Sequence, residues 1–473
     1  MRVSLKFTVV ILILSLAMSG FALSTTGSAS ANGPKRYVLL SANNALPAHL
    51  EALVESAGGK VVSRVDEIGM AVVESAEPNF LEAAGILPGI EGIAEDRAVL
   101  ISPPLDNPAV EGLEGEEGLS VEATAIGSGR FFFAQWSLRA MGADNAFAAG
   151  FKGDARVKVA VIDTGIDYRH QDLSGMVDMV NSKSFFAETW FGMPWPAAAP
   201  AWVDINGHGT HVAGLIGAKG VNVTGVAPGI TLVAIKVAGR SGFADLSTIA
   251  QAIVYAANLG VDVINMSFGD DLTKSELKAD HLKQTLWRAV NLAHARGVFM
   301  ASSAGNNAIN WDDKDHKQLT KVPAQLNHVV GVSATGPFMG WGFDNLAVVQ
   351  TAGGPVVYSD YGKSIVTLAA PGGSQTTFRL PNGMPGDWVI STCALVLTGC
   401  SGGRAGLFSV GTSMASAHIA GAAALIDSAY GGALTGDQIL AILKRGADDF
   451  GKPGFDELYG HGRINVYRSL TLK

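Results

Sequence analysis

From about residue 131 onward, the chain alternates short apolar segments with segments of helical periodicity. The apolar segments are almost continuously hydrophobic, which is typical of strands buried on both faces of a parallel sheet. The pattern predicts an α/β fold, a doubly wound and mostly parallel sheet with helices on both faces. The predicted strands are 157–162, 231–237, 261–266, 298–302 and 329–332, and the predicted helices between them are 210–217, 246–259 and 283–296.

The composition fits a compact body and excludes several other classes of protein. The chain has 473 residues, of which 48% are hydrophobic and 16% are charged, with 58 Gly and two Cys. This apolar fraction excludes wholesale disorder, and two Cys cannot build a disulfide framework or a four-Cys zinc site. The formal net charge of −8 resides in the N-terminal quarter, and the rest is nearly balanced. We therefore expect neither a nucleic-acid partner nor binding to an anionic membrane.

Residues 1–22 predict an export signal. Arg2 and Lys6 precede an apolar run over 7–17, and Gly20-Phe-Ala22 supplies small residues at a cleavage position. The apolar run is much shorter than the roughly 20 residues that a membrane-spanning helix needs. We expect the signal to be removed and the mature protein to be secreted, with no membrane attachment afterwards. An uncleaved N-terminal anchor is the alternative.

Two further regions precede the main body, which spans residues 131–473. Residues 23–102 contain strand and helix patterns that are typical of a small α+β unit. A unit of this size is marginally stable alone, so we expect another part of the chain to cover its sheet. Residues 103–130 are acidic and rich in Gly and Pro, as in an exposed linker. Within the small unit the predicted strands are 36–40, 61–65, 70–73 and 99–101, and the predicted helices are 47–57 and 78–84.

Three reactive side chains stand where predicted strands end or helices begin. Asp163 follows the strand 157–162, His208 opens a helix after Asn206-Gly, and Ser413 opens another in Gly411-Thr-Ser-Met-Ala415. In open α/β sheets, ligands bind beyond the carboxyl ends of the strands. Ser, His and Asp are the residue types that a hydroxyl nucleophile, its base and the group that orients the base require. The sequence therefore predicts a catalytic site at Asp163, His208 and Ser413.

These three windows, in this order, resemble the subtilisin-like serine proteases, or subtilases. The resemblance covers about residues 133–470 and includes Ser302-Ser-Ala-Gly-Asn306, which implies that Asn306 donates to the oxyanion. It implies a serine endopeptidase that acts on polypeptides through an acyl-enzyme. The small unit resembles the subtilase propeptide, which implies an intramolecular inhibitor removed at a site within 103–130. A catalytically silent exported binding protein on the same fold is the alternative.

The resemblance also implies a set of substrate-binding residues. Segment 265–269 resembles the family segment that pairs with the peptide as an extra strand, which explains broad sequence tolerance. Lys321 falls in a segment that often walls the first pocket, where its side chain would favour an acidic or small substrate residue. An aromatic insert at 185–202 is either a packed surface loop or a rim for substrate or partner. The implied substrate-binding residues are Asn206, Ser267, Phe268, Gly269, Ser303, Ala304 and Gly305.

The chemistry requires no cofactor, but the sequence leaves open whether the protein binds a structural calcium ion. Calcium takes oxygen ligands, and the resemblance implies Gln135 and Asp172 as two of them, although the adjoining loop 218–223 is short. His208 and His211 match no common zinc motif, so His211 is expected to be structural. Cys393 and Cys400 flank a short loop, and in an oxidising compartment they are expected to form a disulfide, with two free thiols as the alternative.

Overall fold

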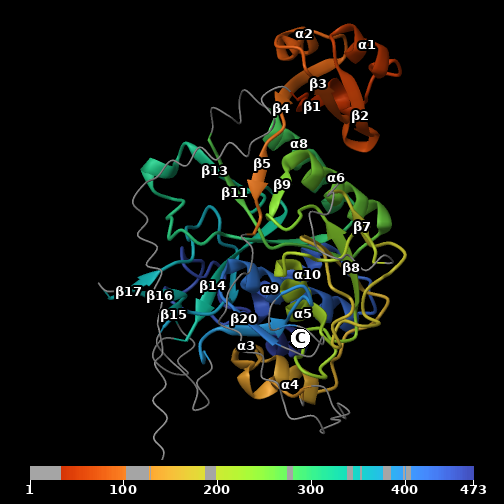
Figure 1. Ribbon diagram of the computed structural model, residues 1–473. Coiled ribbons are helices and arrows are strands. Elements are labelled where there is room, and N and C mark those ends of the chain that lie inside the picture. Colours follow the sequence, from red (N-terminus) through yellow and green to blue (C-terminus); the bar gives the residue numbers. More distant parts are fainter. Residues whose placement is uncertain are drawn as a thin grey trace, which may run out of the picture.

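The computed structural model describes residues 33–102, 127, 129–186, 199–273, 281–337, 345–351, 354–376, 385–397, 400 and 406–472 (Figure 1). The predicted export signal at 1–22, most of the predicted linker 103–130 and most of the aromatic insert 185–202 lie outside the described residues. None of the helices in the described ranges combines the length and the apolar character that crossing a membrane requires.

A mostly parallel sheet forms the centre of the main body, as the sequence predicts. Its strand order is β15–β14–β12–β10–β6–β8–β7, and β18 also pairs with β14. Every described pair in this sheet is parallel except β14 with β15. The strands are β6 (Lys158–Asp163), β7 (Lys183–Ser184), β8 (Thr231–Lys236), β10 (Val263–Met266), β12 (Phe299–Ser303), β14 (Val329–Gly336), β15 (Asn345–Leu346) and β18 (Leu368–Pro371).

Helices cover both faces of this sheet because its strands bury alternate side chains on opposite faces. Val159 and Val161 of β6 belong to one core with residues of α5 and α9, whereas Ala160 and Ile162 belong to a second core with residues of α6 and α8. The doubly wound prediction is confirmed. The helices are α3 (Trp136–Ala140), α4 (Ala143–Ala148), α5 (His208–Gly217), α6 (Leu246–Leu259), α8 (Leu282–Ala295), α9 (Thr412–Ala429), α10 (Gly436–Gly446) and α11 (Val466–Thr471).

The N-terminal unit is a four-stranded antiparallel sheet with two helices on one face (Figure 1). Its other face, which includes Val38, Leu40 and Val72, shares a core with α6 and α8. The main body therefore supplies the cover that this small sheet needs. The sequence prediction omitted its edge strand β4. The elements are β1 (Lys35–Ser41), α1 (Leu50–Ser56), β2 (Lys60–Val65), β3 (Met70–Ser75), α2 (Phe80–Gly85) and β4 (Ile90–Glu95).

After this unit, the chain adds a strand to the main body. β5 (Ala98–Leu100) pairs antiparallel with β9 (Phe243–Asp245), and the Ile101 N–H donates to the Gly242 carbonyl at 2.8 Å. A Cβ atom at Gly242 would lie 1.5 Å from the Ser102 carbonyl oxygen, so glycine is required for this approach. The other two-stranded pairs are β11 (Asp270–Thr273) with β13 (Leu319–Val322), β16 (Val348–Thr351) with β17 (Gly354–Val357), and β19 (Val389–Thr392) with β20 (Gly406–Ser409).

Candidate active site

Asp163 and His208 form a buried pair at the carboxyl edge of the central sheet. Asp163 is the last residue of β6, and His208 is the first residue of α5. Gly207, with φ of 106°, turns the chain into this helix in a conformation that favours glycine. His208 Nδ1 lies 2.9 Å from Asp163 Oδ1 and 3.0 Å from Oδ2. Since Nδ1 faces the carboxylate, Nε2 is the ring nitrogen left for proton transfer.

Asp163 changes the acid–base behaviour of His208. Burial alone lowers the pKa of His208, because it disfavours the charged imidazolium. The negative charge of Asp163 and its hydrogen bond act in the opposite direction and prevail, so the pKa of His208 is raised above its ordinary value. A base stabilised in its protonated form in this way is suited to accept a proton from a hydroxyl.

Asp204 fixes the loop that presents His208. One carboxylate oxygen of Asp204 accepts from the N–H groups of Asn206 and Gly207, and the other accepts from the N–H and hydroxyl of Thr210. The Thr164 hydroxyl donates to Asp204 at 2.9 Å and accepts from the Gly209 N–H. Asp204 is fully buried, so these bonds compensate its charge. The network connects the end of β6 with the start of α5.

Ser413 lies in the first turn of α9 and contacts the strand next to β6. Its hydroxyl donates to the carbonyl of Ser267 at 2.8 Å, and the Ser267 hydroxyl donates to the carbonyl of Ser413 at 2.8 Å. Ser267 directly follows β10, which pairs with β6. The Ser413 hydroxyl therefore lies at the same edge of the sheet as Asp163. No hydrogen bond within the described part of the chain joins Ser413 to His208, so that contact stays a prediction.

Asn306 is held with its amide nitrogen available as a donor. Its Oδ1 accepts from both the N–H and the hydroxyl of Thr412, each at 2.9 Å. Because the backbone N–H can only donate, these bonds assign Oδ1 and leave Nδ2 directed elsewhere. The Ser413 N–H belongs to the first turn of α9, where a helix provides no internal acceptor. Asn306 and Ser413 thus offer two donors beside the start of an 18-residue helix.

Replacing Asn306 with Ala is expected to lower kcat by about 10²–10³-fold with little change in KM, the size of loss seen for such a donor in subtilisin. The donor acts on charge that develops in the transition state, whereas bound substrate carries little of it. Steady-state kinetics on a peptide substrate measures both constants. Asn307→Ala is the control, because Asn307 is also exposed and adjacent. An equal loss in both variants would point to local disruption.

The two segments implied as pocket walls lie close together and approach Lys321. The Ser302 hydroxyl donates to the Phe268 carbonyl at 3.0 Å, which joins the segment 267–269 to the residue directly before the segment 303–305. A Cβ atom at Gly269 would lie 3.2 Å from Cε of Lys321, and one at Gly305 would lie 2.9 Å from its Nζ. Lys321 therefore lies against both segments. Peptide contacts of the residues in these segments stay predictions.

The environment of Lys321 argues against the expected preference for acidic substrate residues, whereas a preference for small residues stays a prediction. Its Nζ donates to Asp271 at 2.6 Å and lies 3.8 Å from a carboxylate oxygen of Asp360. Two carboxylates thus oppose one ammonium group, so Lys321 presents no uncompensated positive charge. Burial raises the pKa of Asp360 although Lys321 opposes this shift. Neither acid was predictable from the local sequence, because Asp271 pairs with Lys321 across β11 and β13 and Asp360 follows β17.

Asn206 and His211 are both buried and bonded within the protein. The Asn206 oxygen accepts from the His208 N–H at 3.1 Å, and its Nδ2 donates to the Arg240 carbonyl at 3.0 Å. A role of Asn206 in substrate binding stays a prediction. Burial lowers the pKa of His211 to about 3, and its Nε2 lies 2.9 Å from the Leu407 carbonyl. This placement agrees with the structural role expected for His211.

Gln135 and Asp172 do not fit a calcium site in this structure. The Asp172 carboxylate accepts from the N–H groups of Val221, Asn222 and Val223 at 2.6–3.3 Å. Gln135 Oε1 accepts from the Thr224 N–H at 2.9 Å. Calcium needs oxygen ligands around it, whereas these oxygens face hydrogen-bond donors. The short loop 218–223 thus places amide groups where a cation would have to bind.

Cys393 and Cys400 are joined by a disulfide with their Cα atoms 5.8 Å apart. Both residues are buried and share a small apolar cluster with Leu407. The disulfide therefore anchors residues beside β20, whose Leu407 carbonyl contacts His211.

Comparison with known proteins agrees with this geometry. The profile of the subtilase family matches residues 154–462, well over half of the chain. A thermophilic serine proteinase from a Bacillus species is 32% identical over 68% of this chain, which spans 63% of that relative. Subtilisin DY from Bacillus licheniformis is 33% identical over 68% of this chain and 94% of its own length.

Solved structures agree on the fold. The epidermin leader peptide processing serine protease of Staphylococcus aureus has a TM-score of 0.71 and 24% identity, over 93% of this chain and 100% of that one. Fervidolysin from Fervidobacterium pennivorans has a TM-score of 0.66 and 22% identity, over 93% of this chain and 61% of that one. The family match together with these relatives shows that the chain belongs to the subtilase family and is a serine-type endopeptidase.

Proposed function

We propose that the chain is the precursor of a secreted endopeptidase that hydrolyses peptide bonds through Asp163, His208 and Ser413 after removal of its N-terminal unit. The observation that carries this proposal is the buried Asp163–His208 pair at the same edge of the sheet as Ser413, which lies in the first turn of α9. The epidermin-processing protease named above acts on a leader peptide by its title. Polypeptides are the substrate class that the family implies.

The proposed reaction uses four side chains of this chain. The Ser413 hydroxyl turns from the Ser267 carbonyl toward His208 and attacks the scissile carbonyl carbon while His208 Nε2 takes its proton. Asp163 stabilises the imidazolium, and Asn306 Nδ2 with the Ser413 N–H binds the oxyanion. The C–N bond then breaks as His208 returns the proton to the leaving amine. Water, deprotonated by His208, hydrolyses the acyl-enzyme and restores Ser413.

We further propose that residues 35–102 inhibit the enzyme until they are removed. β5 occupies the edge of β9 by antiparallel pairing, and backbone pairing of this kind is how extended peptides bind to exposed strands. A peptide substrate that used this edge would have to displace β5. The inhibition therefore requires no contact between the N-terminal unit and Ser413 itself.

Polar contacts on α6 and α8 hold this unit in place. The guanidinium of Arg288 on α8 donates to the carbonyls of Ser41 and Ile68 and pairs with Glu91 at 2.5 Å. Ser247 lies in the first turn of α6, and its N–H and hydroxyl donate to the Asp96 carboxylate at 3.1 and 2.5 Å. Arg288 is 6% exposed while the unit is bound. Loss of the unit would expose the Arg288 guanidinium, which water would then have to hydrate.

We expect the cleaved N-terminal unit to bind more weakly as pH rises from about 4 to about 6. Burial between the two parts, with a smaller effect of Asp245, raises the pKa of Asp96 to about 6. Separation removes this burial, so we expect the pKa of Asp96 to return toward its ordinary value of 3.8 and the free unit to release a proton that the complex holds. Higher pH therefore favours dissociation, by up to about 100-fold in Kd. Activity recovered after dilution of the cleaved complex at each pH measures this Kd.

Asp96→Asn is the informative variant, because Asn keeps the acceptor for Ser247 and cannot ionise. It is expected to flatten the pH dependence between pH 5 and 6, the part of the predicted range that lies above the range in which the paired Glu91, with its lowered pKa, titrates. Glu82→Gln is the control, since Glu82 is exposed on α2, on the far face of the small sheet. A pH profile unchanged by Asp96→Asn would assign the effect to another group.

Expression of the secreted wild type and the Ser413→Ala variant tests the function. Intact mass and a fluorophosphonate label should show that the wild type loses a fragment ending between 103 and 130 and takes one label. The Ser413→Ala variant should do neither. A folded wild type that stays full length and unlabelled would contradict the proposal and favour a catalytically silent binding protein.

A further inference from the structure

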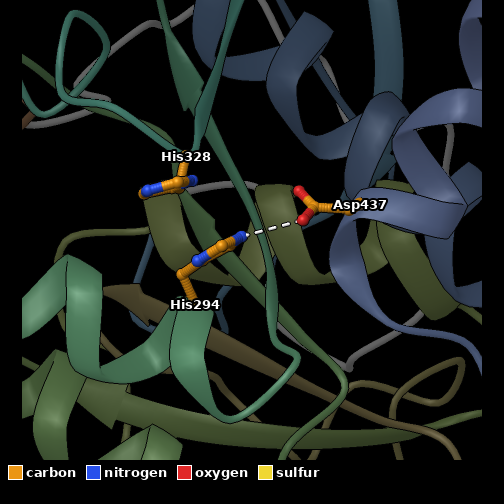
Figure 2. A group of neighbouring side chains, drawn as sticks. All are labelled: His294, His328 and Asp437. Atoms are coloured by element: carbon orange, nitrogen blue, oxygen red, sulfur yellow. Dashed lines mark hydrogen bonds and ion pairs between the residues drawn. The ribbon is translucent and has the colours of Figure 1, made fainter.

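Three side chains that can bind metals meet at the opposite edge of the central sheet from Ser413. His294 lies in the last turn of α8, His328 directly precedes β14, and Asp437 lies in the first turn of α10 (Figure 2). Catalytic side chains stand at the carboxyl ends of the strands, whereas His328 stands at an amino end. The cluster is therefore separate from the catalytic machinery.

The geometry of the cluster is close to that of a metal site. His294 Nε2 lies 3.0 Å from Asp437 Oδ2, and the ligand atoms of all three residues lie within 4.8 Å of one another. Ligand atoms in a tetrahedral zinc site are about 3.3 Å apart, since each lies about 2.0–2.2 Å from the metal. His294 and Asp437 would hardly have to move. To complete the site, the ring of His328 would have to move closer to the other two ligands, and its exposure leaves it room to do so.

His328 is the residue that an ordinary surface ion pair does not explain. The contact between His294 Nε2 and Asp437 Oδ2 at 3.0 Å is complete without any third partner. His328 nevertheless stacks on His294, with ring centroids 3.5 Å apart and planes 15° apart. Its φ is 71°, in the left-handed region that non-glycine residues seldom occupy. Its ring forms no hydrogen bond to any of the described residues, so its nitrogens are available to a ligand.

We propose that His294, His328 and Asp437 bind a structural Zn²⁺ ion that ties α8, β14 and α10 together. Two imidazoles and one carboxylate form a ligand set typical of zinc, whereas calcium and magnesium prefer oxygen ligands alone. The exposure of His328 and Asp437 leaves room for water at the remaining position. The framework around the site is fixed, because the Gly436 N–H donates to the Gly297 carbonyl at 2.7 Å, between α10 and the segment that leads to β12.

Zinc should stabilise the folded chain, because the three ligands come from segments far apart in the sequence and come together only on folding. The test uses the Ser413→Ala precursor, which avoids self-digestion, after treatment with a chelator. Equilibrium dialysis against ZnCl₂ should give one Zn²⁺ per chain, and saturation should raise the Tm by a few degrees. Bound Co²⁺ should show visible absorption bands of imidazole ligation, a reading that is independent of stability.

His328→Asn is the decisive variant, because Asn also adopts the left-handed backbone and supplies no imidazole. It should lose zinc binding, the Tm shift and the Co²⁺ bands while keeping the Tm of the metal-free protein. His294→Gln is a second variant that should behave alike. His49→Asn, at an exposed histidine of the N-terminal unit, should bind zinc as before. Failure to bind zinc at 50 μM, or binding that survives His328→Asn, would overturn the proposal and leave His294 and Asp437 as an ion pair only.

Discussion

Replacing Ser413 with Ala is expected to lower kcat by about 10⁶-fold, the loss that removal of the nucleophile causes in subtilisin, a relative of this chain. The hydroxyl of Ser413, in the first turn of α9, is the proposed nucleophile, and Ala offers no atom that can form the acyl-enzyme. The fold should persist, because the hydroxyl donates a single hydrogen bond, to the Ser267 carbonyl. KM for a peptide anilide should change little.

The kinetic measurement must separate lost chemistry from retained inhibition. Because the Ser413→Ala variant cannot remove its own N-terminal unit, a trace of another protease should cut it within 103–130, and the unit should be separated before the assay. Ser428→Ala is the control, since Ser428 lies in the same helix near its other end. Residual activity of the freed Ser413→Ala enzyme above about 1% of wild type would refute the role of Ser413 as the nucleophile.

Asp163→Asn is expected to lower kcat/KM by about 10⁴-fold, because Asn cannot stabilise the imidazolium and favours the wrong His208 tautomer. Catalysis needs neutral His208, so the acid limb of the pH profile follows its pKa. In the wild type, Asp163 raises that pKa despite burial, and the limb lies above the ordinary value of His. Without Asp163, burial lowers the pKa of His208 and only the smaller effect of the Asp204 charge opposes it, so the limb should move to lower pH.

A profile of kcat/KM against pH between 4 and 10 measures both effects at once. Asp178→Asn is the control, because Asp178 lies near the amino end of β8, where its N–H donates to Leu232. A rate loss without movement of the acid limb would mean that Asp163 maintains local structure and has little influence on the proton affinity of His208.

The sequence predicted the parts of the fold and site that depend on local pattern. Continuous apolar runs predicted the parallel strands, and the end of one run placed Asp163 correctly at the edge of the sheet, whereas Asn306 came from the family resemblance. Hydrophobic periodicity alone marked a helix over 210–217, whereas the residues around the predicted catalytic His correctly placed the start of α5 at His208, after the positive φ of Gly207. The edge strand β4 was missed because its Gly and its acids weaken the strand pattern.

Features that depend on distant partners were not predictable from one sequence. The sequence suggested that Lys321 carries an uncompensated positive charge, because no local sequence pattern indicates that Asp271 and Asp360 lie beside it. The hydroxyl direction of Ser413 depends on the carbonyl of Ser267, 146 residues away. His328 offered no motif, since its partners come from two helices on other segments. In each case the tertiary contact, and not the residue type, determines the chemistry.

The pairing of β5 with β9 has a consequence for how activity appears over time. In the proposed maturation, cleavage within 103–130 would leave β5 in place, so the severed unit would stay bound at the edge of β9 that a peptide substrate would use. Free enzyme then accumulates mainly when an already liberated molecule digests the inhibitor released by another. Activation should therefore be autocatalytic, with a sigmoidal time course whose delay shortens as the starting concentration rises or when a trace of mature enzyme is added as seed.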